Sequence, residues 1–279
     1  MNGDDREGAG DGSNPLVRPP SSALCASLEA VVRGAGALAR EAFGKPIKTW
    51  LKERGSPVTE IDMAVDALLR RELAMIAPDA GWLSEETPPA GLAAPRLWIV
   101  DPIDGTRAFI GGQPDWTVSV ALVEAGRPIV AALYAPVTEE FFLAAAGAGA
   151  RRNGIPISVS RGDAIAGARI GGPKGLLDRL GAVVPDLAIV PRVHSLALRL
   201  ARVADGTLDI ALAGRDARDW DLAAADLLVH EAGGAVTTPE GARIAYNGAT
   251  ATHGGLVAAS KPRLRMLWAL LREHDVQLH

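Results

Sequence analysis

The chain has a single cysteine, Cys25, so no disulfide can form within it. This excludes a disulfide-stabilised scaffold and is compatible with a reducing cytoplasm, where we expect the protein to act. Cys25 lies among apolar residues at helical spacing, which favours a packed side chain over a nucleophile. No stretch stands out as long and apolar enough to cross a bilayer, so we expect no membrane partner.

The chain also lacks an excess of positive charge and a histidine cluster. Its net charge of −4 and pI near 5.8 give no electrostatic case for a nucleic acid polymer or an anionic membrane. None of the five histidines shows the spacing of zinc ligands. Tyrosine and phenylalanine are sparse, so no platform for stacking an adenine base stands out.

Hydrophobic residues make up 48% of the 279 residues, which predicts a packed globule of one large or two small domains. Residues 1–20 are rich in Gly, Asp, Asn and Pro and lack the apolar core of a signal peptide, so we predict a disordered tail. We expect an N-terminal α+β subdomain over 21–155, carrying most metal ligands, and a C-terminal α/β subdomain over 156–279.

Two periodicities alternate along the chain and predict a mixed α/β fold. Apolar residues at helical spacing predict helices over 22–43, 59–76, 174–180, 195–204, 221–232 and 262–273. Alternating or continuous apolar runs predict strands over 47–52, 96–100, 117–122, 128–134, 140–145, 168–171, 188–191, 208–213 and 256–259. Residues 147–154 are predicted to form a loop and turn, because they are rich in glycine and end in Asn-Gly.

The run Asp-Pro-Ile-Asp-Gly-Thr over 101–106 is the most informative motif. Hard divalent cations prefer oxygen ligands, and Asp101 and Asp104, separated by the stiff Pro102, can face one small volume. Gly105 allows a tight turn, and a helix that starts near Thr106 would direct free N–H groups toward a phosphate. The alternative is an ordinary acidic turn, because Asp, Pro and Gly are common turn residues.

Three further segments accompany this motif: Ser-Pro-Val-Thr-Glu-Ile-Asp over 56–62, Trp-Leu-Ser-Glu-Glu-Thr over 82–87, and Asp-Trp-Asp over 219–221, followed by His-Glu-Ala-Gly-Gly over 230–234. In this order, the four segments resemble the inositol monophosphatase superfamily of metal-dependent, often lithium-sensitive phosphatases. The resemblance covers nearly all of the chain beyond about residue 20. It implies a layered α-β-α-β-α sandwich of the sugar-phosphatase type and hydrolysis of a phosphate monoester.

The resemblance also implies a set of metal ligands for two or three Mg²⁺ ions. The first ion would be held by Glu85, Asp101 and the backbone carbonyl of Ile103. The second would be held by Asp101, Asp104 and Asp221, so that Asp101 bridges the pair. The alternatives without a bound metal are a solvated Glu85–Glu86 pair after a strand and an Asp221 that only stabilises the start of its helix.

The remaining roles follow from the same resemblance. Glu86 would act through water at a weaker third ion, and Asp62 and Thr106 would orient or deprotonate the attacking water. Gly105 and Thr106 would offer amides to the phosphate, Lys52 would lie near it, and Ser195 would serve the substrate from a helix N-terminus. Asp62 as a helix N-terminal acid and Thr106 as an N-cap are the alternatives.

The substrate is less well defined than the chemistry. An inositol monophosphate is the first expectation, with a 3′(2′),5′-bisphosphate nucleotide or histidinol phosphate as alternatives and a catalytically silent member as a third. Gly214 stands seven residues before Asp221, where many inositol phosphatases carry an acid for sugar hydroxyls. A second phosphate of the substrate would be met by Arg215, Arg218 and Lys174; alternatively, these are solvated surface charges. His194 stands where many members of the resembling family have glycine. Homodimers are common among the resembling proteins, but no interface can be identified here.

Overall fold

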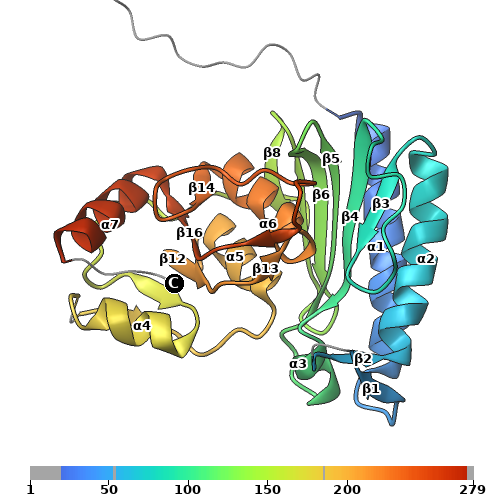
Figure 1. Cartoon of the computed structure of the whole chain (residues 1–279), viewed down its shortest axis with the longest axis horizontal. Coiled ribbons are helices and arrows are strands. Elements are labelled where there is room, and N and C mark those ends of the chain that lie inside the picture. Colours follow the sequence, from blue (N-terminus) through green and yellow to red (C-terminus); the bar gives the residue numbers. More distant parts are fainter. Residues whose placement is uncertain (1–19, 53–54, 185, 275–279) are drawn as a thin grey trace, which may run out of the picture.

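The computed structural model describes residues 20–52, 55–184 and 186–274, and these form five layers (Figure 1). Helices α1 and α2 cover one face of a seven-stranded sheet, α5 and α6 lie between this sheet and a five-stranded sheet, and α4 and α7 cover the far side. The expected α-β-α-β-α sandwich is therefore confirmed. The helices are α1 Ser22–Ala42, α2 Glu60–Ile76, α3 Thr106–Ile110, α4 Lys174–Gly181, α5 Leu196–Ala204, α6 Asp219–Glu231 and α7 Lys261–Glu273.

The seven-stranded sheet has the order β3-β4-β5-β6-β7-β8-β9 and is antiparallel except for the parallel β3–β4 pair. Its strands are β3 Gly81–Ser84, β4 Arg96–Asp104, β5 Thr117–Glu124, β6 Arg127–Ala135, β7 Glu140–Ala145, β8 Gly149–Arg152 and β9 Ile155–Pro156. Because β3 and β4 run in parallel, the acids that end them, Glu85 after β3 and Asp101 to Asp104 on β4, come out at the same edge.

The five-stranded sheet has the order β11-β10-β12-β16-β14. Its strands are β10 Arg169–Gly171, β11 Ala188–Ile189, β12 Ile210–Ala213, β14 Gly234–Thr237 and β16 Leu256–Ser260. Two short antiparallel pairs complete the described chain: β1 Thr49–Leu51 with β2 Pro57–Thr59, and β13 Ala217–Arg218 with β15 Thr252–His253.

Helix α1 corrects one expectation from the sequence. The helix has 21 residues, and an 18-residue window within it has a mean hydropathy of 1.3, so by length and composition it could cross a membrane, although no such stretch was expected. The helix packs against α2 and the sheet, and Leu28, Val32, Ala35 and Ala39 are fully buried in this contact. This one-sided burial indicates a helix of the protein core.

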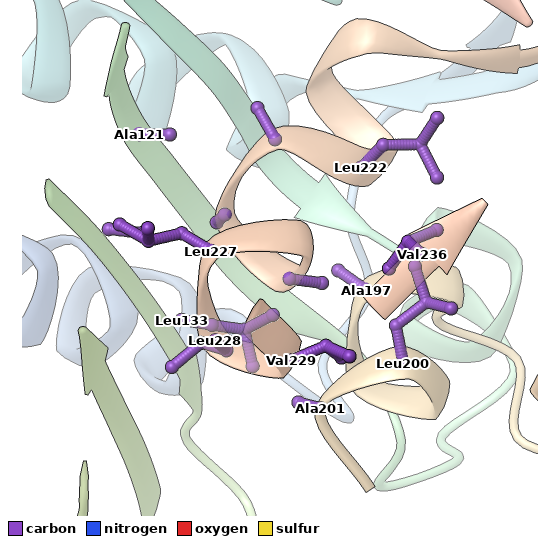
Figure 2. Packing of buried hydrophobic residues seen from close by; sticks show 14 of the residues in the cluster. Ala121, Leu133, Ala197, Leu200, Ala201, Leu222, Leu227, Leu228, Val229 and Val236 are labelled. Atoms are coloured by element: carbon purple, nitrogen blue, oxygen red, sulfur yellow. The ribbon is translucent and has the colours of Figure 1, made fainter. Parts of the chain in front are cut away.

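The middle helices form the central core with both sheets. Leu222, Leu228 and Val229 of α6 belong to the same buried cluster as Leu133 of the large sheet and Val236 of the small sheet (Figure 2). Small residues on α5, such as Ala197 and Ala201, allow α5 and α6 to pack closely (Figure 2). Since α6 begins with Asp219 and Asp221, this buried packing fixes the position of an acidic helix start.

Most predicted elements are confirmed within a few residues, but some were missed. Strand β8 occupies part of the predicted loop over 147–154, and β14 follows Gly233 where no strand was predicted. Helix α6 starts at Asp219, two residues before the predicted start. The predicted tail lies outside the described residues except for Pro20. The division at 155/156 stays a proposal; the large sheet ends there, at β9.

Candidate metal centre

Asp101, Asp104 and Asp221 form the centre of the site, although Asp221 is more than a hundred residues from the other two in sequence. One carboxylate oxygen from each lies within 4.8 Å of the others. The first two lie at the end of β4, where a bulge interrupts pairing with β5, and Asp221 lies in the first turn of α6. The bulge re-aims the side chains at this end of the strand.

Asp101 is buried, and its two oxygens have different surroundings. Its Oδ1 accepts a hydrogen bond of 3.0 Å from the Ile103 amide, whereas its Oδ2 is buried with no partner among the described residues. Burial raises the pKa of Asp101 well above its ordinary value, and the charges of Glu85 and Asp104 add to this. A buried, unpartnered carboxylate oxygen is costly unless a cation meets it, so this residue fits the bridging role.

Asp104 is held in place by the N-terminus of α5. Its Oδ2 accepts hydrogen bonds from the Ser195 hydroxyl at 2.5 Å and from the Ala197 amide at 2.7 Å. Burial raises the pKa of Asp104 to about 6, although the Ser195 bond opposes the rise. One oxygen is thus fixed by the protein while the carboxylate still belongs to the three-acid cluster.

Asp221 supports the start of its helix and also lies in the acid cluster. Its Oδ2 accepts a 2.7 Å hydrogen bond from the Arg218 amide, which supports the start of α6. It also belongs to the cluster, where burial and the charge of Asp104 raise its pKa well above the ordinary value. Helix capping and metal binding are therefore compatible in this side chain.

Glu85 and Glu86 are not a solvated pair, because Lys52 binds both. Its Nζ lies 2.8 Å from Glu85 and 2.7 Å from Glu86, and the Glu86 side chain is only 2% exposed. Burial raises the pKa of Glu86 to about 7, and Lys52 opposes the rise. Although burial lowers the pKa of Lys52, the two glutamates raise it overall.

Asp62 and Thr106 meet across the site. The Thr106 hydroxyl lies 3.3 Å from Asp62 Oδ1 and 3.1 Å from the carbonyl oxygen of Ile103. Asp62 Oδ2 accepts a 2.8 Å hydrogen bond from the Thr59 amide, so Asp62 also completes the capping box of α2. Burial raises the pKa of Asp62.

Thr106 is the first residue of α3 and not its N-cap, which corrects that alternative. The cap position is Gly105, whose φ of 95° lies in the left-handed region that favours glycine. A Cβ at Gly105 would lie 3.3 Å from the Asp115 carbonyl oxygen and 3.4 Å from the Ser195 amide nitrogen. The sequence motif therefore needs glycine for both conformation and space.

Ser195 and His194, which the sequence placed near the substrate, both contact acids at or near the cluster. Ser195 is fully buried, and its hydroxyl contacts Asp104, Thr117 and the Leu198 amide, so the structure places it beside a metal-ligand candidate. His194 Nδ1 and its amide both lie within hydrogen-bond distance of Asp115 Oδ2, at 2.8 and 2.6 Å.

Of the three cations weighed for a second phosphate, two already have partners. Lys174 pairs with Asp178 at 2.7 Å, and Arg218 donates to the Thr252 hydroxyl at 2.7 Å. Arg215 is exposed on the turn before β13. These contacts weaken the case that the three residues act together on one anion.

No signal in the sequence points to the residues that hold the metal-binding candidates in place. Asp66 on α2 accepts hydrogen bonds from the hydroxyls of Ser84 and, at 3.0 Å, Thr87, which brace the segment that carries Glu85 and Glu86. Ser84 also accepts a 3.2 Å bond from the Glu86 amide. The pairing of Asp66 with residues about twenty positions away leaves no local signal. The pairing of Asp115 with His194 likewise has no signature in the sequence.

Comparison with known proteins identifies a family that matches most of the chain. The profile of the inositol monophosphatase family matches residues 21–275. An inositol-1-monophosphatase of Rhizobium meliloti is 35% identical, covering 79% of this chain and 87% of its own length. A histidinol-phosphatase of Mycobacterium tuberculosis is 33% identical over 72% of this chain and 82% of its own length. The crystal structure of the suhB protein of Bartonella henselae superposes with a TM-score of 0.80 at 28% identity, covering 90% and 99%.

Proposed function

The chain belongs to the inositol monophosphatase family and is a phosphatase, and from this premise we propose that it hydrolyses an inositol monophosphate or a closely similar small phosphate monoester with Mg²⁺. The single observation that carries the metal-dependent chemistry is the convergence of Asp101, Asp104 and Asp221, with a buried oxygen of Asp101 left without a protein partner.

We propose that Mg²⁺ is bound by two groups of ligands. Glu85, Asp101 and the Ile103 carbonyl would hold one ion, and Asp101, Asp104 and Asp221 a second; Glu86 would reach a third through water. All-oxygen donor sets of this kind suit Mg²⁺. When bound, the ions lower the pKa of a water molecule and neutralise charge on the phosphoryl oxygens.

The residues around the proposed metal ligands are assigned different roles. Asp62 accepts a hydrogen bond from Thr106, so the pair can accept and direct a proton at Asp62 Oδ1. The Gly105 and Thr106 amides are proposed to bind phosphoryl oxygens, and Lys52 places a positive charge beside Glu85 and Glu86. Ser195 is proposed to serve the substrate side through its position at the α5 start.

The proposed substrate class depends on the relatives and on one position, Gly214, at which this chain differs from many family members. The inositol-1-monophosphatase relative favours an inositol monophosphate. Gly214 in place of an acid removes one side chain that would hold sugar hydroxyls, and the histidinol-phosphatase relative makes histidinol phosphate the second candidate. A 3′(2′),5′-bisphosphate nucleotide is a further candidate, for which Lys174, in an exposed pair with Asp178, and Arg218, bonded to the Thr252 hydroxyl, are the cations available to a second phosphate.

The test is phosphate release from inositol 1-phosphate, histidinol phosphate, 3′-phosphoadenosine 5′-phosphate and fructose 1,6-bisphosphate, each with Mg²⁺, with chelator and with added Li⁺. We expect the highest kcat/KM for inositol 1-phosphate, loss of release with chelator, and inhibition by Li⁺. A preference for histidinol phosphate would replace the substrate. Absence of release from all four by the folded, Mg²⁺-bound protein would favour a silent family member.

We further propose that the enzyme acts in the cytoplasm on small molecules. The lone cysteine, Cys25, is partly buried on α1 and has its pKa raised by burial, as expected of a reduced packing residue. A homodimer is also proposed, because small soluble enzymes often form symmetric dimers. Size measurement in solution would test it.

A further inference from the structure

A cavity lies along the second half of α6, away from the carboxylate cluster at its start. Its volume is about 470 Å³, within the range of small-molecule sites. Asp226, Leu227, His230 and Glu231 of α6 line one side. Because α6 rises about 1.5 Å per residue, its last turn lies about 13 Å along the helix from Asp221.

The opposite walls come from four other segments, which the fold ties together. They are the start of β6, the turn after β7, strand β14 and the segment that follows it, which carries Arg243. The Arg127 guanidinium donates to the Ile244 carbonyl, and the Tyr246 amide donates to the Gly126 carbonyl at 3.1 Å. Thr237 and Arg243 form a bridge across the turn between them. The cavity is therefore preformed by contacts distant in sequence.

The acids that line the cavity accept hydrogen bonds from the protein, whereas its two arginines make few. Asp226 accepts a 3.0 Å hydrogen bond from the Tyr246 hydroxyl. The two oxygens of Glu231 accept bonds of 3.0 and 2.9 Å from the amides of Gly147 and Gly149. Arg127 and Arg243 are both exposed at the cavity, and their charges act on Asp226. Within the described residues, the Arg243 side chain makes no hydrogen bond and no ion pair within 4 Å, and Arg127 donates a single hydrogen bond. The unfilled groups are hydrogen-bond donors with positive charge.

We propose that this cavity binds a small organic monoanion, a carboxylate on a short apolar body, with Arg243 and Arg127 as its charged partners. The guanidinium group presents paired N–H donors that match the two oxygens of a carboxylate. The apolar body would lie against Pro128, Ile129 and Val236. A phosphate dianion is less suitable, because Asp226 and Glu231 would repel the extra charge at close range. The proposal does not depend on the phosphatase substrate.

The test is a titration of ¹⁵N-labelled, metal-free protein, in chelator, with benzoate and hexanoate, followed by NMR. Benzamide is the neutral control, and inorganic phosphate tests the other anion class. We expect saturable shifts at the amides of Gly147, Leu227 and Ala235 with the carboxylates alone. Arg243→Gln should weaken benzoate binding about 10-fold or more, because one charge-assisted contact is lost. The matched control is Arg265→Gln, an exposed arginine on α7, which should bind benzoate as the wild type does.

A cavity-filling variant, Ala146→Leu, gives a second test if Arg243→Gln does not fold. It should abolish benzoate shifts at an unchanged melting temperature. The proposal is overturned if neither carboxylate gives saturable shifts at these amides, if benzamide or phosphate binds as tightly as benzoate, or if Arg243→Gln and wild type bind benzoate equally. Shifts confined to residues around Asp104 would also overturn it, because they would place the anion at the metal centre.

Discussion

At the residue scale, the carboxylates of the site repel one another, and bound metal ions are expected to relieve this repulsion. Four buried or partly buried acids have raised pKa values with burial as the leading cause: Asp101, Asp104, Asp221 and Glu86. In the part of the chain that the structure describes, Lys52 alone forms an ion pair with these acids, through Glu86 and the neighbouring Glu85. The cluster is therefore built for bound cations and is unfavourable without them.

A pH dependence of stability follows for the metal-free protein. A carboxyl group whose pKa is raised on folding stabilises the fold below its unfolded value, near 4, and this contribution is lost as pH rises through the folded value. For Asp104 and Glu86 the loss therefore falls between about pH 4 and pH 7. The melting temperature should fall over this window in chelator and recover with Mg²⁺.

Asp104→Asn isolates one part of that effect. The variant should be more stable than the wild type at pH 7.5 in chelator, by about 3 kcal/mol at most, and the two should converge below about pH 4. Asp226, with a pKa raised to about 6 by burial, adds the same slope to both proteins and cancels in the comparison. Equal slopes for the two proteins in calorimetry would show that Asp104 does not titrate in this way.

Ser195 is expected to act on the metal centre through Asp104. Ser195→Ala removes the hydroxyl that donates to Asp104 and caps α5. Loss of the cap should cost about 1 kcal/mol of stability, and loss of the orienting bond should weaken Mg²⁺ affinity about 10- to 100-fold. Calorimetric titration of Mg²⁺ measures the second effect, and Ser195→Thr should restore it. A cap role alone would lower the melting temperature and leave Mg²⁺ affinity unchanged.

At the element scale, the turn between β4 and α3 sets the relative position of ligands and amides. Gly105 has a φ of 95° and close backbone neighbours, whereas Gly112, with a φ of 67°, has nothing within 4 Å of its Cβ position. Gly105→Ala should destabilise the protein by roughly 1–3 kcal/mol and reduce kcat, because strain and crowding combine. Gly112→Ala carries strain alone and should cost less in denaturant unfolding and leave kcat unchanged. Equal effects of both substitutions would refute the crowding argument.

The same scale shows what local sequence can and cannot predict. The helix α2 was predicted with its Thr59 cap because capping residues and apolar spacing are local signals. Strand β8 was missed because glycine-rich sequence favours a turn, while pairing with β7 decides the conformation. The acids of the site were identified from four short motifs through a family resemblance. Their braces, Asp66 and Asp115, were not, because a hydrogen bond between distant segments leaves no periodic trace.

At the scale of the whole molecule, the centre lies where the layers meet. The large sheet supplies Asp101 and Asp104, α6 supplies Asp221, and the start of α5 holds Asp104 from the other side. Both middle helices are packed in the central core, so the distance between the acids depends on the packing of the two halves (Figure 2). Substitutions in this core should change metal affinity as well as stability.

The N-terminal segment is expected to contribute nothing to catalysis. Deletion of residues 1–20 leaves Ser21, whose hydroxyl accepts from the Leu24 amide and caps α1. The truncated protein should therefore retain kcat/KM within about 2-fold and the same melting temperature, because α1 keeps its cap and its buried face. A large loss of activity in the same phosphate-release assay would show that the segment is functional.

The most direct measurement is Mg²⁺-dependent phosphate release from inositol 1-phosphate by the wild type and by Asp104→Asn, Asp221→Asn and Glu124→Gln. Glu124 is an exposed acid at the end of β5 and serves as the control. The account predicts that both aspartate variants fold normally but lose at least about 100-fold in kcat, whereas Glu124→Gln matches the wild type. Turnover retained by a folded Asp104→Asn or Asp221→Asn, or wild-type turnover in chelator, would contradict the assignment of this carboxylate cluster as the metal centre of a phosphatase.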